Sequence, residues 1–162
     1  MGFVKAQGSF TLREVSRGDA YVLWLWANDP LTRQAALDTH TIAWEEHHTW
    51  LAQKIGSSNA RIWIAVDETD RLLGCIRFET TNAWETTKLS YTVAPDIRGT
   101  GVGRHIVEAG AGRIQTEHPG ARIIADVRTP NVPSLRIFRG LAWDEAAPRD
   151  EVIRFSRIGE SE

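Results

Sequence analysis

Cysteine is nearly absent from this chain, and several other features are missing as well. The 162 residues include one cysteine, Cys75, which excludes a disulfide framework within the chain and fits a reducing compartment. The formal net charge of −2 provides no positive field for a nucleic-acid backbone, so no nucleic-acid partner is expected. No apolar run approaches the length of a membrane span, and the N-terminus lacks a signal-peptide pattern. We therefore expect a cytoplasmic protein without a membrane partner.

The composition is that of a globular protein. Charged residues make up 25% of the chain and hydrophobic residues 42%, and we find no repeats, linkers or low-complexity segments. A chain of this length is expected to form one domain, residues 1–162, with a core of its own. Cys75 stands in an apolar, strand-like run, so we interpret it as a core residue and not as a nucleophile.

Apolar periodicity predicts strands and helices in alternation along the chain. Asn28-Asp29-Pro30 is interpreted as the stop of the first helix, and Asn131 as the cap of the last. Together the elements predict a single α/β domain built on a mixed sheet. The predicted strands cover 9–15, 61–66, 72–78, 89–93, 121–127 and 152–158, and the predicted helices cover 20–27, 41–55 and 102–117 and begin again at 132.

The most informative stretch is 89–104, which reads L-S-Y-T-V-A-P-D-I-R-G-T-G-V-G-R. It begins as a strand, and Pro95 ends the ladder because it has no N–H to donate. A glycine-rich turn follows, and an apolar helix begins at Val102. Backbone N–H groups of such a turn can approach an anion closely, and a helix N-terminus adds about half a positive charge. The stretch therefore predicts a phosphate-binding loop.

Two better-known phosphate loops do not fit this stretch. The Walker pattern requires Gly-Lys-Ser/Thr, whereas Gly103 is followed by Arg104 and His105. The dinucleotide pattern G-x-G-x-x-G would begin at Gly99, but position 104 is arginine and no acidic residue follows at the expected distance. The pattern that remains is R-x-x-G-x-G.

That remaining pattern, with V-x-P upstream, resembles the acyl-CoA pyrophosphate loop of the GCN5-related N-acetyltransferase (GNAT) superfamily, Q/R-x-x-G-x-G/A. The match is carried by Arg98, Gly101 and Gly103, and the order of elements resembles the family across nearly the whole chain. The resemblance implies a central mixed sheet flanked by about four helices, and acetyl-CoA as co-substrate, with no metal. Dimers are common in the family, so a homodimer is a further expectation. The cofactor-binding residues that it implies are Thr92, Val93, Arg98, Gly99, Thr100, Gly101, Val102, Gly103, Arg104, Asn131, Ser134 and Phe138.

The last helix departs from the family pattern at one position. Members often show N-x-x-A-x-x-x-Y-x-K-x-G-F, in which the asparagine contacts CoA and the tyrosine protonates the leaving thiolate. Asn131 and Ser134 hold the register here, but the tyrosine position is Phe138, which has no proton to give. We expect the thiolate to leave unassisted, since a thiol of pKa about 8.5 is a tolerable leaving group. Protonation by water or Ser134, or CoA binding with little turnover, are the alternatives.

The general base is less clearly indicated. Family bases usually lie on or just before the strand at 89–93, and Glu85 and Glu79 are the carboxylates available there. Either could draw the proton from the amine through a water molecule. Each also fits a solvated loop acid. Asp126 lies in an apolar strand, which could raise its pKa, although such a residue is more often simply hydrogen-bonded.

The acceptor side is expected from the first two helices. The runs L-W-A-N-D-P and I-A-W-E-E-H-H-T-W-L resemble acetyltransferases of nucleotide-linked amino sugars, with Asn28 and His47 at matching positions and Arg33 as a substitute phosphate contact. His47 also fits a satisfied core histidine. A His47–His48 metal pair is not expected, because adjacent helical residues point about 100° apart. The rival acceptor is a protein N-terminus of the ribosomal-protein type, and the rival class is a CoA-binding module without turnover.

Overall fold

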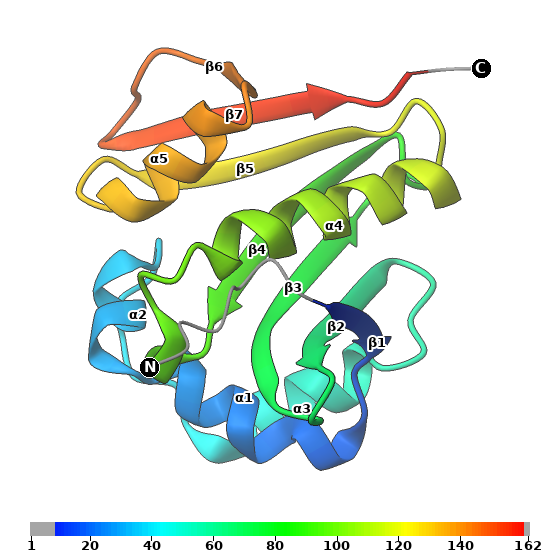
Figure 1. The fold of residues 1–162 in the computed structure, drawn as a ribbon, viewed down its shortest axis with the longest axis vertical. Coiled ribbons are helices and arrows are strands. Elements are labelled where there is room, and N and C mark those ends of the chain that lie inside the picture. Colours follow the sequence, from blue (N-terminus) through cyan, green and yellow to red (C-terminus); the bar gives the residue numbers. More distant parts are fainter. Residues whose placement is uncertain (1–8, 161–162) are drawn as a thin grey trace.

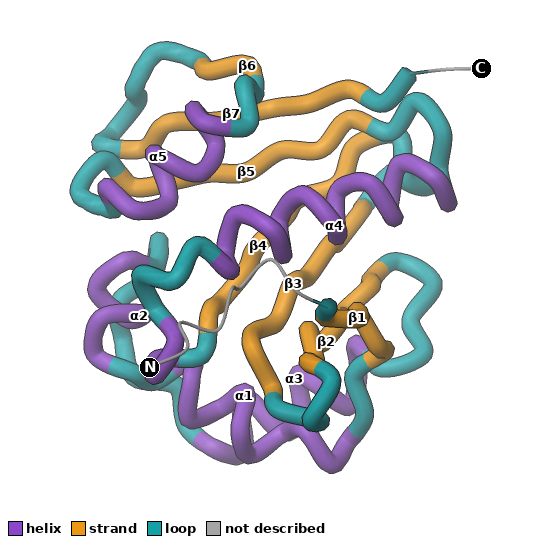
Figure 2. Tube along the Cα trace, viewed as in Figure 1, coloured by secondary structure: helices purple, strands orange, loops and turns teal. Residues whose placement is uncertain are grey.

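A computed structural model describes residues 9–160 of the chain. Along it a first strand is followed by three helices and three strands, and then by a helix, a strand, a helix and two strands (Figures 1 and 2). The strands are β1 (Phe10–Glu14), β2 (Ala60–Asp67), β3 (Leu72–Thr80), β4 (Thr86–Val93), β5 (Arg122–Arg128), β6 (Asp144–Glu145) and β7 (Val152–Ile158). The α-helices are α1 (Ala20–Ala27), α2 (Pro30–Ala35), α3 (Trp44–Lys54), α4 (Val102–Glu117) and α5 (Val132–Gly140), and short 3-10 turns lie at Arg17–Asp19 and Pro95–Ile97.

The strands form one mixed sheet in the order β1-β2-β3-β4-β5-β7-β6. All neighbours run antiparallel except β4 and β5, which are parallel. Those two strands pair only from Thr86↔Arg122 to Lys88↔Ile124, whereas β4 stays paired with β3 as far as Val93. Beyond Lys88 the two parallel strands diverge toward the N-terminal ends of α4 and α5 (Figure 1). We call this divergence the strand fork.

Helices cover both faces of the sheet. Gly110 of α4 lies against Ile76 and Phe78 of β3, so these two β3 side chains define one face. Glu79, the next residue on the same strand, points to the opposite face, where Lys54 of α3 lies 2.8 Å from its carboxylate. The core between sheet and helices includes Trp63, Phe78, Phe138 and Phe155, each essentially without exposed surface.

The two glycines inside α4 have different environments. A Cβ at Gly110 would lie 2.6 Å from Ile76 Cδ1, so any other residue would force the Ile76 side chain or the helix to shift. A Cβ at Gly112 would meet nothing within 4 Å. Close packing therefore explains the first glycine and not the second. The helix is 16 residues long, and no helix in residues 9–160 combines the length and apolarity needed to cross a membrane.

Two features of the N-terminal half differ from the sequence prediction. Asn28-Asp29-Pro30 ends α1 but also starts α2: Asp29 accepts hydrogen bonds from Leu31 N and Thr32 N, and Pro30 takes the first helical position. The next helix begins at Trp44 and not at Thr41, because residue Ile42 is held by side chains of α1 and its C-cap residue. The fifth helix, beyond the four implied by the family resemblance, is the short α2.

The one cysteine, Cys75, is half-buried and packs against the core. Removal from water raises the pKa of the Cys75 thiol to about 12, so the thiol stays protonated near neutral pH. It lies on β3 opposite Thr92 of β4. These features fit the interpretation of Cys75 as a structural residue.

Candidate active site

The glycine turn after β4 has the geometry of an anion cradle. Gly99 and Gly101 have φ angles of +77° and +86°, which side-chain-bearing residues rarely adopt. A Cβ at either position would meet nothing within 4 Å, so the space in front of the turn is open. Gly101 is the N-cap of α4, and the first N–H groups of that helix have no intrahelical acceptor. The turn thus offers backbone donors and a helix dipole to a phosphate group.

The start of α4 is fixed by close contact with β4 and α5. Val102 is 2% exposed. A Cβ at Gly103 would lie 3.1 Å from Val93 Cγ2 and 3.2 Å from Ile137 Cδ1. A side chain at this position would therefore push the first turn of α4 slightly away from both elements. Thr100 closes the turn by donating a 2.7 Å hydrogen bond from Oγ1 to the carbonyl of Ile97.

The strand fork leaves one edge of β4 without a strand partner. Thr92 and Val93 pair with β3, and β5 pairs with neither of them. Their edge facing β5 can therefore hydrogen-bond an extended ligand that runs inward from the glycine turn. An amide-containing arm such as pantetheine fits this edge, and a pyrophosphate fits the turn, so the residues present suit a CoA thioester.

The two arginines of the turn have different partners. Arg98 Nη2 lies 2.6 Å from Asp29 Oδ2 and 2.8 Å from Thr32 Oγ1, so it ties the turn to the N-terminus of α2. Arg104 is exposed, and its nearest hydrogen-bond acceptor is the carbonyl of Gly140 at 3.5 Å. Of the two, Arg104 has the freer guanidinium for a phosphate.

The N-terminus of α5 lies across the strand fork from β4. Asn131 caps the helix, because its Oδ1 accepts from the Ser134 N–H at 3.3 Å. Ser134 Oγ lies 2.6 Å from the hydroxyl oxygen of Tyr91, a β4 residue. Phe138 has no exposed surface and packs against Trp143 and Phe155. In the sequence, Tyr91 carries no signal of a functional role beyond the apolar alternation of its strand.

The candidate bases are placed apart. Glu85 lies in the loop before β4, at the end of the strand fork where β4 and β5 are still paired. Leu89 is four residues further along the chain, or about 13 Å. Glu79 lies opposite Lys88, the last β4 residue that pairs with β5, and its carboxylate contacts Lys54 at 2.8 Å and Arg77 at 3.7 Å. Glu79 is therefore nearer to the fork than Glu85.

Asp126 does not have the raised pKa that its apolar strand suggested. Arg154 donates two hydrogen bonds to its carboxylate, at 2.8 and 3.0 Å, and Lys88 lies 3.5 Å away. These contacts, led by the Arg154 hydrogen bonds, lower the pKa of Asp126 below its ordinary value. Of the two interpretations of Asp126, the hydrogen-bonded one is confirmed. The cations that bind it come from β7 and β4, and strand register is a tertiary feature that local sequence does not reveal.

The residues expected on the acceptor side hold backbone in place. Asn28 exchanges hydrogen bonds with Ile42, donating to its carbonyl at 3.0 Å and accepting from its N–H at 2.8 Å. Arg33 donates to the carbonyls of Ala27, Asp38 and His40.

His47 has a similar structural role. Its ring donates to the Ala20 carbonyl at 3.0 Å, and burial lowers its pKa. These side chains join α1, α2 and α3 into one unit. No group of three or more metal-ligating side chains occurs among the described residues.

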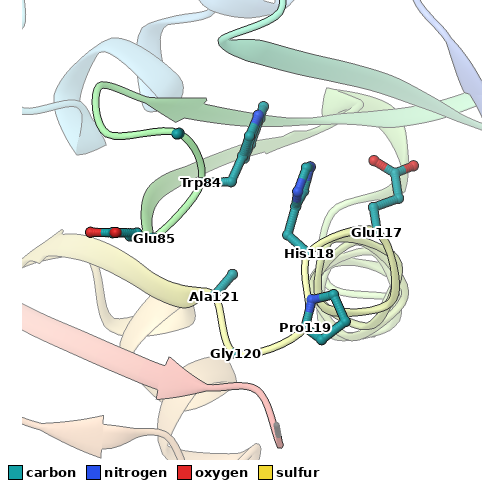
Figure 3. A pocket seen from close by; sticks show the side chains of 8 residues that line it. Trp84, Glu85, Glu117, His118, Pro119, Gly120 and Ala121 are labelled. Atoms are coloured by element: carbon teal, nitrogen blue, oxygen red, sulfur yellow. The ribbon is translucent and has the colours of Figure 1, made fainter. Parts of the chain in front are cut away.

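A pocket of about 350 Å³ lies far from the glycine turn. It is at the C-terminal end of α4, where the Trp84 and His118 rings stack at 4.7 Å and Glu85 forms part of the wall (Figure 3). A helix of 16 residues is about 24 Å long, so this pocket and the turn lie at opposite ends of α4. The pocket is therefore separate from the glycine turn.

A mixed sheet whose parallel strands fork beside an open glycine turn suits a protein that binds an acyl-CoA thioester. Residues 9–142 match the family described as the acetyltransferase (GNAT) domain. The chain belongs to this family and is an N-acetyltransferase. No curated protein sequence matches it significantly.

Solved structures share the fold at low sequence identity. Spermidine N-acetyltransferase from Vibrio cholerae, in complex with CoA and spermine, superposes with a TM-score of 0.82 at 16% identity, covering 93% of this chain and 95% of that one. Ribosomal-protein-alanine N-acetyltransferase from Brucella melitensis gives 0.75 at 18% identity, covering 91% and 99%. A domain from Methanocaldococcus jannaschii DSM 2661 gives 0.79 at 18%, covering 93% and 98%.

Proposed function

We propose that this enzyme transfers an acetyl group from acetyl-CoA to a primary amine of a small molecule. The observation that carries the proposal is the open glycine turn of Gly99 and Gly101 at the N-terminus of α4, which leads directly to the unpaired edge of β4. A phosphate-bearing donor bound there places its reactive end in the strand fork, between the two faces of the sheet.

The residues of the site mainly bind and orient. N–H groups from Gly99 to Arg104 hold the pyrophosphate, and the backbone of Thr92 and Val93 holds the pantetheine arm. Acetyl-CoA supplies an already activated thioester, so correct placement of donor and amine accounts for much of the rate. Asn131 fixes the start of α5 beside the fork, with Ser134 and Phe138 one and two turns further along.

We further propose Glu79 as the preferred base of the two candidates. Glu79 lies beside the end of the strand fork where β4 and β5 are still paired. Its side chain faces away from α4, on the side covered by the N-terminal helices. Glu79→Gln should lower kcat by about 10²-fold, the lower range for removal of a general base, while Glu85→Gln should leave it near the wild-type value. The opposite ranking would assign the role to Glu85.

The nucleotide-linked amino sugar stays a prediction with reduced support. It depended on Asn28, Arg33 and His47 as contacts for a sugar or diphosphate, and their polar atoms are bonded to backbone groups. To contact the amine substrate, any of these side chains would have to form a further hydrogen bond in addition to those with the backbone. The charge around the fork gives no alternative preference, because Glu79 and Asp126 are each paired with two cations.

The test is thiol release from acetyl-CoA with a panel of amines. The panel holds a UDP-linked 4-amino sugar, spermine, and a ribosomal-protein N-terminal peptide that begins with alanine. Turnover of a small amine supports the proposal, and turnover of the peptide alone would replace it with protein N-terminal acetylation. CoA binding without turnover on any amine would favour a binding module. Light scattering of the same sample tests the predicted homodimer.

A further inference from the structure

The hydroxyl groups of Tyr91 and Ser134 meet across the strand fork. Tyr91 belongs to β4 and Ser134 to the first turn of α5, and their oxygens are 2.6 Å apart. The Tyr91 ring lies under the first turn of α4, where its Cε2 would be 3.5 Å from a Cβ at Gly103. The phenol oxygen is therefore held between the N-terminal turns of both helices that flank the proposed donor path.

Tyr91 occupies the position along β4 that the thioester sulfur of the donor should reach. A ligand that enters at Gly99–Arg104 and follows the edge of β4 passes Val93 and Thr92 before Tyr91. It cannot continue past Lys88, because β5 takes over the pairing there. The thioester at the inner end of the pantetheine arm thus lies within the short segment from Lys88 to Thr92. Two side chains of that segment, Tyr91 and Lys88, carry a phenol or an ammonium group, which are weak acids with an ordinary pKa of about 10. The Lys88 ammonium lies 3.5 Å from the Asp126 carboxylate, which leaves the Tyr91 phenol for the sulfur.

Phe138 cannot protonate the CoA thiolate, the role that the family tyrosine has at this position. Its ring is fully buried among Tyr91, Trp143 and Phe155, with centroids 5.0 to 6.3 Å away. A phenyl ring has no hydrogen-bonding group. Tyr91 packs edge-on against this ring and carries the hydroxyl that Phe138 lacks.

We propose that Tyr91 is the proton donor to the CoA thiolate and that Ser134 is the positioning residue that orients its hydroxyl, an inference that rests on the proposed function. Glu79 takes one proton from the ammonium group, and the neutral amine attacks the thioester. The new C–N bond forms and the C–S bond breaks. The sulfur takes the Tyr91 proton and leaves as CoA thiol. The phenolate regains a proton from the nitrogen of the former ammonium group, through water or the Ser134 hydroxyl. Acetyl-CoA and amine are thereby converted into amide and CoA thiol, with the tyrosine restored.

The protonation state of Tyr91 supports this assignment. Burial raises the pKa of its phenol, and the Ser134 hydrogen bond opposes that effect only in part. The phenol consequently keeps its proton near neutral pH. When Ser134 donates to the phenol oxygen, the phenol hydrogen remains available to point into the fork.

The first test separates catalysis from binding. Tyr91→Phe keeps the ring and its packing, and we expect kcat to fall about 10²-fold or more while KM for acetyl-CoA stays within about threefold. Ser134→Ala should give a smaller loss in kcat, about tenfold, because the phenol is retained but loses its orienting partner. Tyr21→Phe is the matched control, since Tyr21 is the other tyrosine of the chain and is 61% exposed. A Tyr91→Phe kcat equal to wild type, or a change in KM alone, would overturn the proposal.

The second test reads Tyr91 without any turnover. The chain has two tyrosines, so 3-fluorotyrosine incorporated into the Tyr21→Phe variant labels residue 91 alone. We expect its ¹⁹F resonance to shift on saturation with CoA and to stay unchanged with an amine alone. No shift, with CoA binding shown by calorimetry, would overturn the proposal even if Tyr91→Phe fails to fold. A shift with no acetyl transfer to any amine would instead leave Tyr91 beside the thiol and count against the proposed function.

Discussion

Substitution of Gly101 by glutamate tests the phosphate site through two separable effects. The first is backbone strain: Gly101 has φ +86°, and an L-residue held there costs about 1–2 kcal/mol. The second is charge. A carboxylate about 4 Å from a phosphate near a protein surface is disfavoured by about 4 kcal/mol, which corresponds to about a thousandfold in affinity.

Gly120 offers a control for the strain. It has φ +81°, a Cβ there would meet nothing within 4 Å, and it follows the opposite end of α4. Gly120→Glu therefore imposes the same backbone cost and the same charge change far from the turn. Gly101→Ala adds a second control, with the strain at the turn but no charge.

The assay is calorimetric titration of each variant with CoA, after thermal denaturation has shown that it is folded. We expect Gly101→Glu to lose about a thousandfold in affinity relative to Gly120→Glu, and Gly101→Ala to lose less than about tenfold. CoA affinity in Gly101→Glu that stays within tenfold of Gly120→Glu would refute the assignment of the turn to the pyrophosphate.

Three further predictions concern stability. Gly112→Ala should raise the free energy of unfolding by about 1 kcal/mol, while Gly110→Ala should lower it because its Cβ would lie 2.6 Å from Ile76; chemical denaturation that ranks them in reverse would contradict the packing described. Phe138→Tyr should lower it by about 1–3 kcal/mol without raising kcat, because the added hydroxyl enters a fully buried aromatic cluster, and a gain in kcat would contradict this. Arg13 lowers the pKa of Asp19 in the folded protein, so their ion pair contributes fully to the free energy of unfolding above the ordinary pKa of 3.8, and this contribution is lost as the pH falls through the lower folded pKa. Asp19→Asn should remove that part of the pH dependence of unfolding, and an unchanged pH profile would argue against the ion pair.

Local patterns predicted much of the fold because its helices and strands carry strong signals of their own. The last strand was predicted at 152–158 and the main helix from Val102, as observed. The residues Asp29 and Pro30 were misjudged because the same pair both stops one helix and starts the next. The delayed start of α3 follows from the hold of Asn28 on Ile42, a contact between residues 14 apart that no local pattern reveals.

The candidate site was predictable only where backbone shape is encoded in residue type. Glycines with positive φ can be anticipated from sequence, and so the phosphate turn was located. The hydrogen-bond partners of side chains cannot be anticipated from the sequence in this way. The uses of Arg33 and His47 on backbone carbonyls, and the meeting of Tyr91 with Ser134, depend on how distant segments pack.

The contact between Arg98 and Asp29 links two segments that are 69 residues apart in the chain. One carboxylate both starts α2, through Leu31 N and Thr32 N, and anchors the arginine of the glycine turn. A ligand that draws Arg98 away from Asp29 therefore alters the first turn of α2. By thermodynamic reciprocity, a ligand that shifts α2 alters affinity at the turn by the same factor. A stronger ion pair between Arg98 and Asp29 therefore gives a larger coupling free energy between ligand binding at the glycine turn and ligand binding at α2.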